Sequence, residues 1–204
     1  MIPARDLCAS AAVNVRHGIN RDRRFPLNVF VGDWEEFLFF DSDWMFAAEF
    51  VQYIKTLLDL ENGACACLLN LDSATAGEKA ERLFFIDRQT TPGTYQSLLS
   101  GDGPASGWAY DVDRYGCSSD TGAWCMYCER ANEIAVIALR SSSSLERYRS
   151  GITQFHAVRF REAVEEPLSY GFSALPMPWR AEALRQYAAR PLAADASGKR
   201  ETES

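Results

Sequence analysis

Short apolar runs separated by turn residues dominate the chain, and they predict several buried β-strands. The clearest pair is residues 123–129 and 134–140, which flank a polar turn and predict a hairpin. In the first run, alternation places Trp124, Met126 and Cys128 on one face. The second run is almost wholly apolar, which is typical of a central strand covered on both sides. Further strands are expected over residues 27–31, 36–40, 64–71, 82–86, 108–112 and 153–160.

A different spacing predicts the helices. Apolar residues from Phe46 to Leu58 recur every three or four positions, as on one buried helical face. Ser42 or Asp43 suits the start of this helix, and Asn62-Gly63 suits its end. Four shorter helices are expected over residues 91–99, 141–149, 161–166 and 179–190.

The order of these elements predicts an α+β fold. Strands and helices are interspersed without strict alternation, and Gly32-Asp33 predicts a second hairpin that joins residues 27–31 to 36–40. We therefore expect a mixed or mainly antiparallel sheet with helices packed on it. The 204 residues suit a single domain, which we place over residues 25–190. Residues 1–24 lack periodicity and predict an irregular lead-in, and residues 191–204 predict a disordered tail.

The charge of the chain is acidic and unevenly distributed. Asp and Glu number 28 against 21 Lys and Arg, for a net charge of −7. Residues 31–72 hold nine acids and one base, and residues 102–133 hold six acids and two bases. This balance disfavours a nucleic-acid partner and favours a basic protein partner. No apolar run approaches the ~20 residues of a membrane span, and no secretory signal is evident, so we expect a cytoplasmic protein with no membrane partner.

The chemistry-bearing residues offer no complete catalytic motif. HExxH, GxxxxGK[ST] and GxSxG are all absent from the sequence. Cys65-x-Cys67 and Cys125-x-x-Cys128 have spacings that zinc sites use, but on a strand Cys125 and Cys128 point to opposite faces. We therefore expect buried free thiols, with no metal, no cofactor and no assigned catalytic residue.

The segment from Trp108 to Glu129 combines aromatic, acidic and loop-forming residues, a composition that protein-binding surfaces use against basic partners. Within and after it, Tyr115-Gly-Cys-Ser-Ser-Asp-Thr-Gly-Ala-Trp-Cys-Met-Tyr-Cys-Glu129 and Glu133-Ile-Ala-Val-Ile-Ala138 resemble segments of small bacterial immunity proteins. Those proteins belong to polymorphic-toxin and contact-dependent inhibition systems. The resemblance implies a stoichiometric inhibitor that binds a cognate toxin, often a nuclease with a basic groove.

The sequence thus predicts an immunity-type protein that neutralises a toxin through an acidic, aromatic-rich surface. The predicted contacts fall in two patches, one of Asp111, Asp113, Tyr115, Asp120 and Glu129, the other of Asp33, Glu35 and Glu36. The oligomeric state is left open.

Two alternative functions remain at this point. One is an enzyme that uses a divalent cation shared by Asp111 and Asp113, or a thiol nucleophile at Cys117, which falls in a predicted polar loop. The other is a non-catalytic regulatory or structural subunit.

Overall fold

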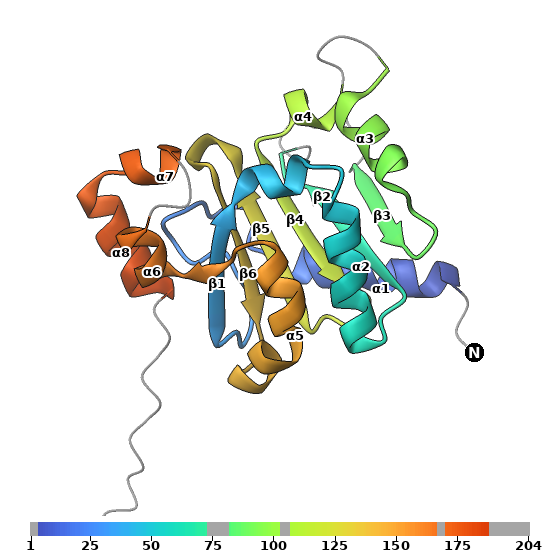
Figure 1. Ribbon diagram of the computed structural model, residues 1–204, viewed down its shortest axis with the longest axis horizontal. Coiled ribbons are helices and arrows are strands. Elements are labelled where there is room, and N and C mark those ends of the chain that lie inside the picture. The colour runs from blue at the N-terminus through green and yellow to red at the C-terminus, as the bar shows by residue number, and fades with distance from the viewer. Residues whose placement is uncertain (1–3, 73–81, 103–106, 167–169, 188–204) are drawn as a thin grey trace, which may run out of the picture.

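A computed structural model describes residues 4–72, 82–102, 107–166 and 170–187. Its described strands form one seven-stranded sheet in the order β3-β2-β4-β5-β6-β1-β7, and every pairing is antiparallel (Figure 1). This confirms the predicted α+β class. The strands are β1 (Glu36–Asp41), β2 (Cys65–Asn70), β3 (Leu83–Asp87), β4 (Arg114–Ser119), β5 (Trp124–Glu129), β6 (Ile134–Leu139) and β7 (Val158–Arg159).

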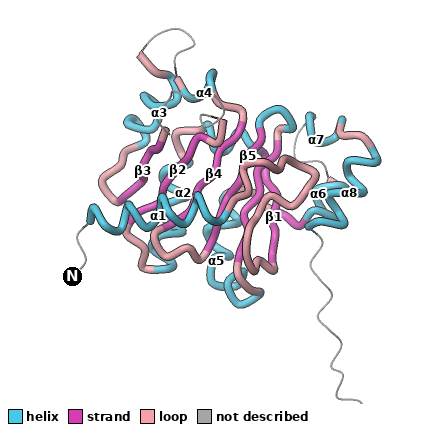
Figure 2. The backbone as a smooth tube through the Cα atoms, turned by 180° about the vertical axis from the view of Figure 1, so that it is seen from behind, coloured by secondary structure: helices cyan, strands magenta, loops and turns pink. Residues whose placement is uncertain are grey.

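Helices cover both faces of the sheet. One face carries the 3-10 helix η1 and helices α2, α3, α4 and α5, and the other carries α1, α6, α7 and α8 (Figures 1 and 2). No described helix has the length and apolar character needed to cross a membrane. The helices are α1 (Ala4–Gly18), η1 (Ser42–Phe46), α2 (Phe50–Glu61), α3 (Pro92–Ser100), α4 (Trp108–Asp111), η2 (Arg130–Asn132), α5 (Ser142–Gln154), α6 (Phe160–Glu165), α7 (Tyr170–Ala174) and α8 (Met177–Tyr187).

The central strands contribute to two apolar cores, one on each side of the sheet. Trp124, Met126 and Cys128 of β5 enter the core beneath α2 and α5, as predicted. Cys125 and Tyr127 of the same strand enter the opposite core beneath α1 and α8. β6 is buried along its whole length between β5 and β1, which confirms that it is a central strand covered on both sides.

The predicted helix after Ser42 is confirmed with an interruption. Asp41 caps η1 by accepting a hydrogen bond from the Asp43 backbone N–H at 2.8 Å. Ala47 then adopts an extended conformation, and α2 begins at Phe50. The left-handed Asn62 (φ 57°) ends α2, at the predicted position.

The predicted N-terminal lead-in is wrong, because residues 4–18 form helix α1. This helix lies across β2 and β4 on the rear face (Figure 2) and buries Ala11 and Val15. The close packing requires a glycine beneath it: a Cβ on Gly116 would lie 2.5 Å from Ile19 Cδ1. The N-terminal segment is therefore part of the folded domain.

Three predicted strands are also wrong. Residues 27–31 contribute only an isolated bridge between Ile19 and Phe30, so β1 pairs with β6 and β7 and the predicted 27–40 hairpin does not form. Residues 108–111 form α4. Within 153–160, only Val158 and Arg159 pair as a strand. The predicted tail, residues 191–204, lies outside the described residues.

Candidate functional site

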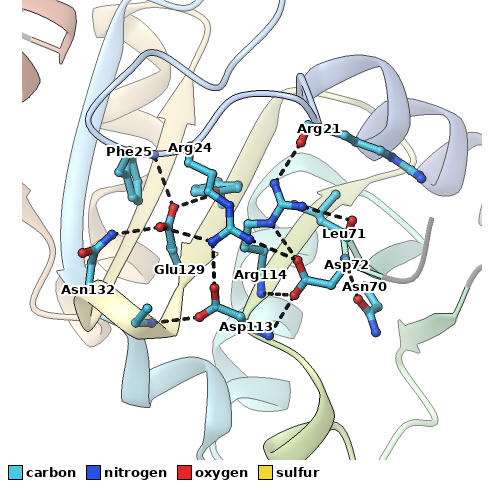
Figure 3. A network of polar contacts seen from close by, with 12 residues as sticks. Arg21, Arg24, Phe25, Asn70, Leu71, Asp72, Asp113, Arg114, Glu129 and Asn132 are labelled. Atoms are coloured by element: carbon cyan, nitrogen blue, oxygen red, sulfur yellow. Dashed lines mark hydrogen bonds and ion pairs between the residues drawn. The ribbon is translucent and has the colours of Figure 1, made fainter. Parts of the chain in front are cut away.

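A network of charged side chains lies where several strands end together (Figure 3). Arg114 opens β4, Glu129 closes β5, and the two residues are opposite each other in the sheet. Asp72 follows β2, and Asp113 directly precedes β4. Arg24 belongs to residues 19–30, the segment that follows α1, and its side chain contacts Asp113 and Glu129. Two of the predicted contact residues, Asp113 and Glu129, therefore do lie close together.

The pair at the base of this network is Arg114 with Asp72. The Arg114 Nε donates to Asp72 Oδ1 at 2.7 Å, and only 6% of the Arg114 side chain is exposed. Asp72 Oδ2 accepts from the backbone N–H groups of Asp113 and Arg114, at 2.9 and 2.8 Å. Arg114 Nη1 also donates to the Arg21 carbonyl oxygen at 2.8 Å. The pair therefore ties β4 to both the end of β2 and the 19–30 segment.

Arg24 and Glu129 hold the same segment from above. Arg24 Nη1 donates to Asp113 Oδ2 at 3.0 Å and lies 3.8 Å from Glu129 Oε1. The Glu129 carboxylate also accepts from the Phe25 N–H, the Tyr127 hydroxyl and the Asn132 amide. Burial raises the pKa of Glu129 above its ordinary value, although the hydrogen bonds from Tyr127 and Phe25 act in the opposite direction.

The network thus fastens the 19–30 segment over the rear core. Directly after Arg24, the Phe25 ring packs edge-on against Tyr127, with ring centroids 4.9 Å apart. Further along, the Tyr187 hydroxyl accepts from the Val29 N–H and donates to the Leu27 carbonyl. Each carboxylate of the network accepts hydrogen bonds from its own chain, which is the arrangement of a structural clamp.

The lowered pKa of Asp72 predicts that the stability of the protein depends on pH in the acidic range. Burial alone would raise the pKa of Asp72, but the Arg114 hydrogen bonds and the Asp113 N–H outweigh it and lower the pKa below the ordinary 3.8. A depressed pKa means that the stabilising contribution is complete above 3.8 and is lost as pH falls through the folded-state value. We expect Asp72→Asn to flatten the acid limb of the stability curve, as measured by urea unfolding at a series of acidic pH values. An identical acid limb in wild type and variant would contradict this role of Asp72.

The structure corrects the predicted surface position of three contact residues. Tyr115, Glu129 and Glu36 are buried, with exposed fractions of 2, 4 and 5%. Tyr115 stacks on Trp108 and donates its hydroxyl to the Trp108 carbonyl at 2.6 Å. Glu36 accepts from Ser142 Oγ and Arg159 Nη2, at 2.8 and 3.0 Å. These side chains face inward because their strands are covered, so a protein partner does not reach them in this conformation.

Two further predicted contacts are half-buried and bonded to the chain itself. Asp113 pairs with Arg24 and accepts from the Ala131 N–H at 2.9 Å. The Asp120 carboxylate accepts from the N–H groups of Ala64 and Cys65, where β2 begins. Asp111 ends α4, and its side chain lies outside the described part of the structure.

Asp33 and Glu35 are the predicted contacts that are exposed, and they lie on a tightly held loop. The loop, residues 31–35, is fixed by a Val31 N–H bond to the Gly18 carbonyl and a Glu35 N–H bond to the Leu139 carbonyl, at 2.9 and 3.0 Å. Within the described part of the chain, neither carboxylate has a hydrogen bond or an ion pair. Both are therefore available to a partner.

Trp34 and Arg140 stiffen this loop, and neither was predicted as a site residue. The Trp34 indole N–H donates to the Val31 carbonyl at 2.8 Å, and the Arg140 guanidinium stacks on the Trp34 ring at 3.8 Å. Arg140 also donates to the Asp33 carbonyl. A hollow of about 90 Å³ lies beside the ring and is lined in part by His17. Glu36 pairs with Leu139, so the next residue, Arg140, lies beside the loop that precedes β1. Prediction of this contact from the sequence would have required the register between β1 and β6.

Five of the six cysteines are buried, and Cys8 is half-buried. Cys117 lies on β4 and is fully buried, which corrects its predicted place in a polar loop. Burial raises the pKa of the Cys117 and Cys128 thiols well above the ordinary value and that of Cys125 to about 12. Among the described residues, no group of three or more His, Cys, Asp or Glu side chains is placed to hold a metal ion.

These positions predict the reactivity of the thiols. A soluble maleimide should modify Cys8, which is half-buried, and leave the five buried cysteines unmodified until the protein is denatured. Peptide mass spectrometry after timed labelling measures this order. Rapid labelling of Cys117 in the native protein would contradict its assignment to the core and favour the thiol-enzyme alternative.

Comparisons with known proteins return no relative: no protein-family model, no curated protein and no solved structure matches this chain.

Proposed function

We propose that this protein is an immunity-type protein that acts in the cytoplasm by binding and neutralising a cognate toxin with a basic surface. The observation that carries the proposal is the 31–35 loop, which holds the unpaired carboxylates of Asp33 and Glu35 outward on a backbone fixed at both ends. A fixed loop loses little conformational entropy on binding, and exposed carboxylates attract a cationic partner over long range.

Apolar surface next to these carboxylates supports the same proposal. Val31, in the same loop, is 48% exposed, and the half-buried Trp34 lies between the two acids in the sequence. Protein interfaces combine apolar anchors of this kind with a charged rim. The anchors contribute most of the affinity, and the rim contributes a faster association and selectivity for the partner. We therefore place the proposed acidic binding surface at residues 31–35 and not at residues 108–129.

Charge reversal in the loop tests the proposal. Asp33→Lys/Glu35→Lys should lower the association rate constant for the toxin by about tenfold or more at low ionic strength, because it turns attraction into repulsion. Asp43→Lys/Glu49→Lys makes the same charge change at exposed positions beyond the opposite end of β1 and serves as the control. Stopped-flow or biosensor kinetics over a range of salt concentrations measures both variants.

We expect the association rate constant of the loop variant to stay level or rise with salt concentration, and those of wild type and the control to fall. If the folded loop variant binds as fast as wild type at every salt concentration, the toxin does not use this loop.

A further inference from the structure

Two cysteines that neither the 31–35 loop nor the charged network uses lie where helix α1 crosses strand β2. Cys8 belongs to α1 and is half-buried, and Cys65 opens β2 and is 1% exposed. Figure 2 shows α1 lying across the rear face of the sheet. The packing of this helix therefore brings together two thiols that are far apart in the sequence.

Both thiols lie between α1 and the sheet. Cys8 comes three and seven residues before Ala11 and Val15, which are buried on the inner face of α1, and residues at these spacings share one face of a helix. Side chains alternate along a strand, so Cys65 shares a face of β2 with Cys67, which packs in the rear core beneath α1. The thiol groups of Cys8 and Cys65 lie within hydrogen-bonding distance of each other.

The backbone around the two cysteines is held in one arrangement. Asn14 of α1 donates its side-chain amide to the carbonyl oxygens of Ser119 and Asp120, at 2.9 and 3.1 Å. The Asp120 N–H in turn donates to the Cys65 carbonyl at 2.9 Å, and the Asp120 carboxylate accepts from the Cys65 N–H at 3.4 Å. These bonds tie α1 to the start of β2, so the two sulfur atoms stay neighbours in the folded protein.

We propose that Cys8 and Cys65 form a disulfide bridge when the protein meets an oxidised low-molecular-weight disulfide such as oxidised glutathione. The Cys8 thiolate attacks one sulfur of oxidised glutathione, forms a mixed disulfide and releases one glutathione. The Cys65 thiolate then attacks the Cys8 sulfur and displaces the second glutathione. Two protein thiols lose two electrons and two protons in all, and one glutathione disulfide becomes two glutathione molecules.

The different exposure of the two thiols sets the order of these steps. Cys8 is half-buried and within reach of a small molecule, whereas burial, the Cys8 thiol and the Asp120 carboxylate raise the pKa of the Cys65 thiol. Cys65 therefore reacts only with a sulfur already held beside it, and its attack is the slow step. A thiol of high pKa is also a poor leaving group, so the bridge is reduced slowly once it has formed. The bridge is thus a durable link between α1 and the sheet.

Reaction of the reduced full chain with excess oxidised glutathione tests the proposal. Peptide mass spectrometry without reductant should find Cys8 joined to Cys65 and the other cysteines free. Three results would overturn the proposal: a bridge from Cys8 to a different cysteine, a stable glutathione adduct on Cys8 with no bridge, or no reaction at Cys8.

Cys65→Ala separates the two steps. This variant should stop at the mixed disulfide of Cys8 with glutathione, because no second thiol completes the exchange. Cys67→Ala is the matched control, since Cys67 lies two residues further along the same strand on the same face, and it should form the bridge as wild type does. A bridge from Cys8 in Cys65→Ala, or its loss in Cys67→Ala, would show that Cys8 pairs with a different thiol.

The bridge should also raise the unfolding temperature by about 10 °C, because it closes a long loop of the unfolded chain and fits the native positions of α1 and β2. Calorimetry of oxidised and reduced wild type measures this shift, and Cys8→Ser treated in the same way should show none. A bridged protein that unfolds at or below the temperature of the reduced form would mean that α1 and β2 must move apart from their native contact to form the bridge, which contradicts the proposal.

Discussion

Val15→Asp is expected to destabilise the protein by about 4 kcal/mol or more, because it places a carboxylate in an apolar core without a partner. Val15 is fully buried on the inner face of α1, and its Cγ2 would lie 2.9 Å from a Cβ on Gly116. A loss of this size is a large part of the ~5–15 kcal/mol that stabilises a typical domain.

Val13→Asp is the matched control, since Val13 belongs to the same helix and is 43% exposed. Its substitution should change the free energy of unfolding by no more than about 0.5 kcal/mol. Urea unfolding followed by circular dichroism measures both variants. Equal and small effects would mean that α1 does not pack on the sheet and that residues 1–24 are an irregular lead-in after all.

The second large effect is expected at the charged clamp. Asp72→Ala leaves the Arg114 guanidinium, whose side chain is 6% exposed, without its carboxylate, and it leaves two backbone N–H groups unpaired. Removal of one partner from a buried ion pair costs about 3–5 kcal/mol, but the Asp72 side chain is 25% exposed, which lowers this cost. We expect a loss of about 2–3 kcal/mol, measured as the free energy of unfolding at neutral pH.

An exposed ion pair in the same protein is the control. Asp59 pairs with Arg88 at 2.8 Å, but both side chains are at least 60% exposed. Asp59→Ala should therefore cost at most about 1 kcal/mol. If Asp72→Ala is no more harmful than Asp59→Ala, the network of Figure 3 does not fasten the 19–30 segment.

Strands with a strong apolar pattern could be predicted from the sequence, and weakly patterned elements could not. β2, β5 and β6 are continuous apolar runs, so their burial and the β5–β6 hairpin follow from local pattern alone. β4 reads Arg-Tyr-Gly-Cys-Ser-Ser, which resembles a loop. Its Gly116 is required by the close approach of Val15 and Ile19, a tertiary constraint that a local pattern does not carry.

Helix α1 was missed for a related reason. Among the side chains of α1 that the structure describes, the buried apolar ones are Ala11, Ala12 and Val15, and so short a set gives little apolar periodicity. The short segment 27–31 has the composition of a strand. In the structure β1 pairs with β6, and the segment forms only the isolated bridge between Phe30 and Ile19. In both cases the tertiary structure overrides the local preference.

The sequence predicted that the candidate site is acidic, but not which acidic residues are exposed to form it. Acids cluster in residues 31–72 and 102–133, yet charge alone does not say which of them pair inside the fold. Glu129 and Asp113 are satisfied by Arg24, which lies far from them in the sequence. Asp33 and Glu35 are exposed and lie in the 31–35 loop, before β1 begins.

The most direct test of the central claim is growth of bacteria that express the neighbouring reading frame with and without this chain. The proposed function predicts that the neighbour arrests growth alone, that this chain restores growth, and that the two proteins co-purify in a fixed ratio. Asp33→Lys/Glu35→Lys should weaken the rescue, and Asp43→Lys/Glu49→Lys should preserve it. A neighbour whose toxicity is unchanged by this chain, with no complex recovered, would contradict neutralisation by binding.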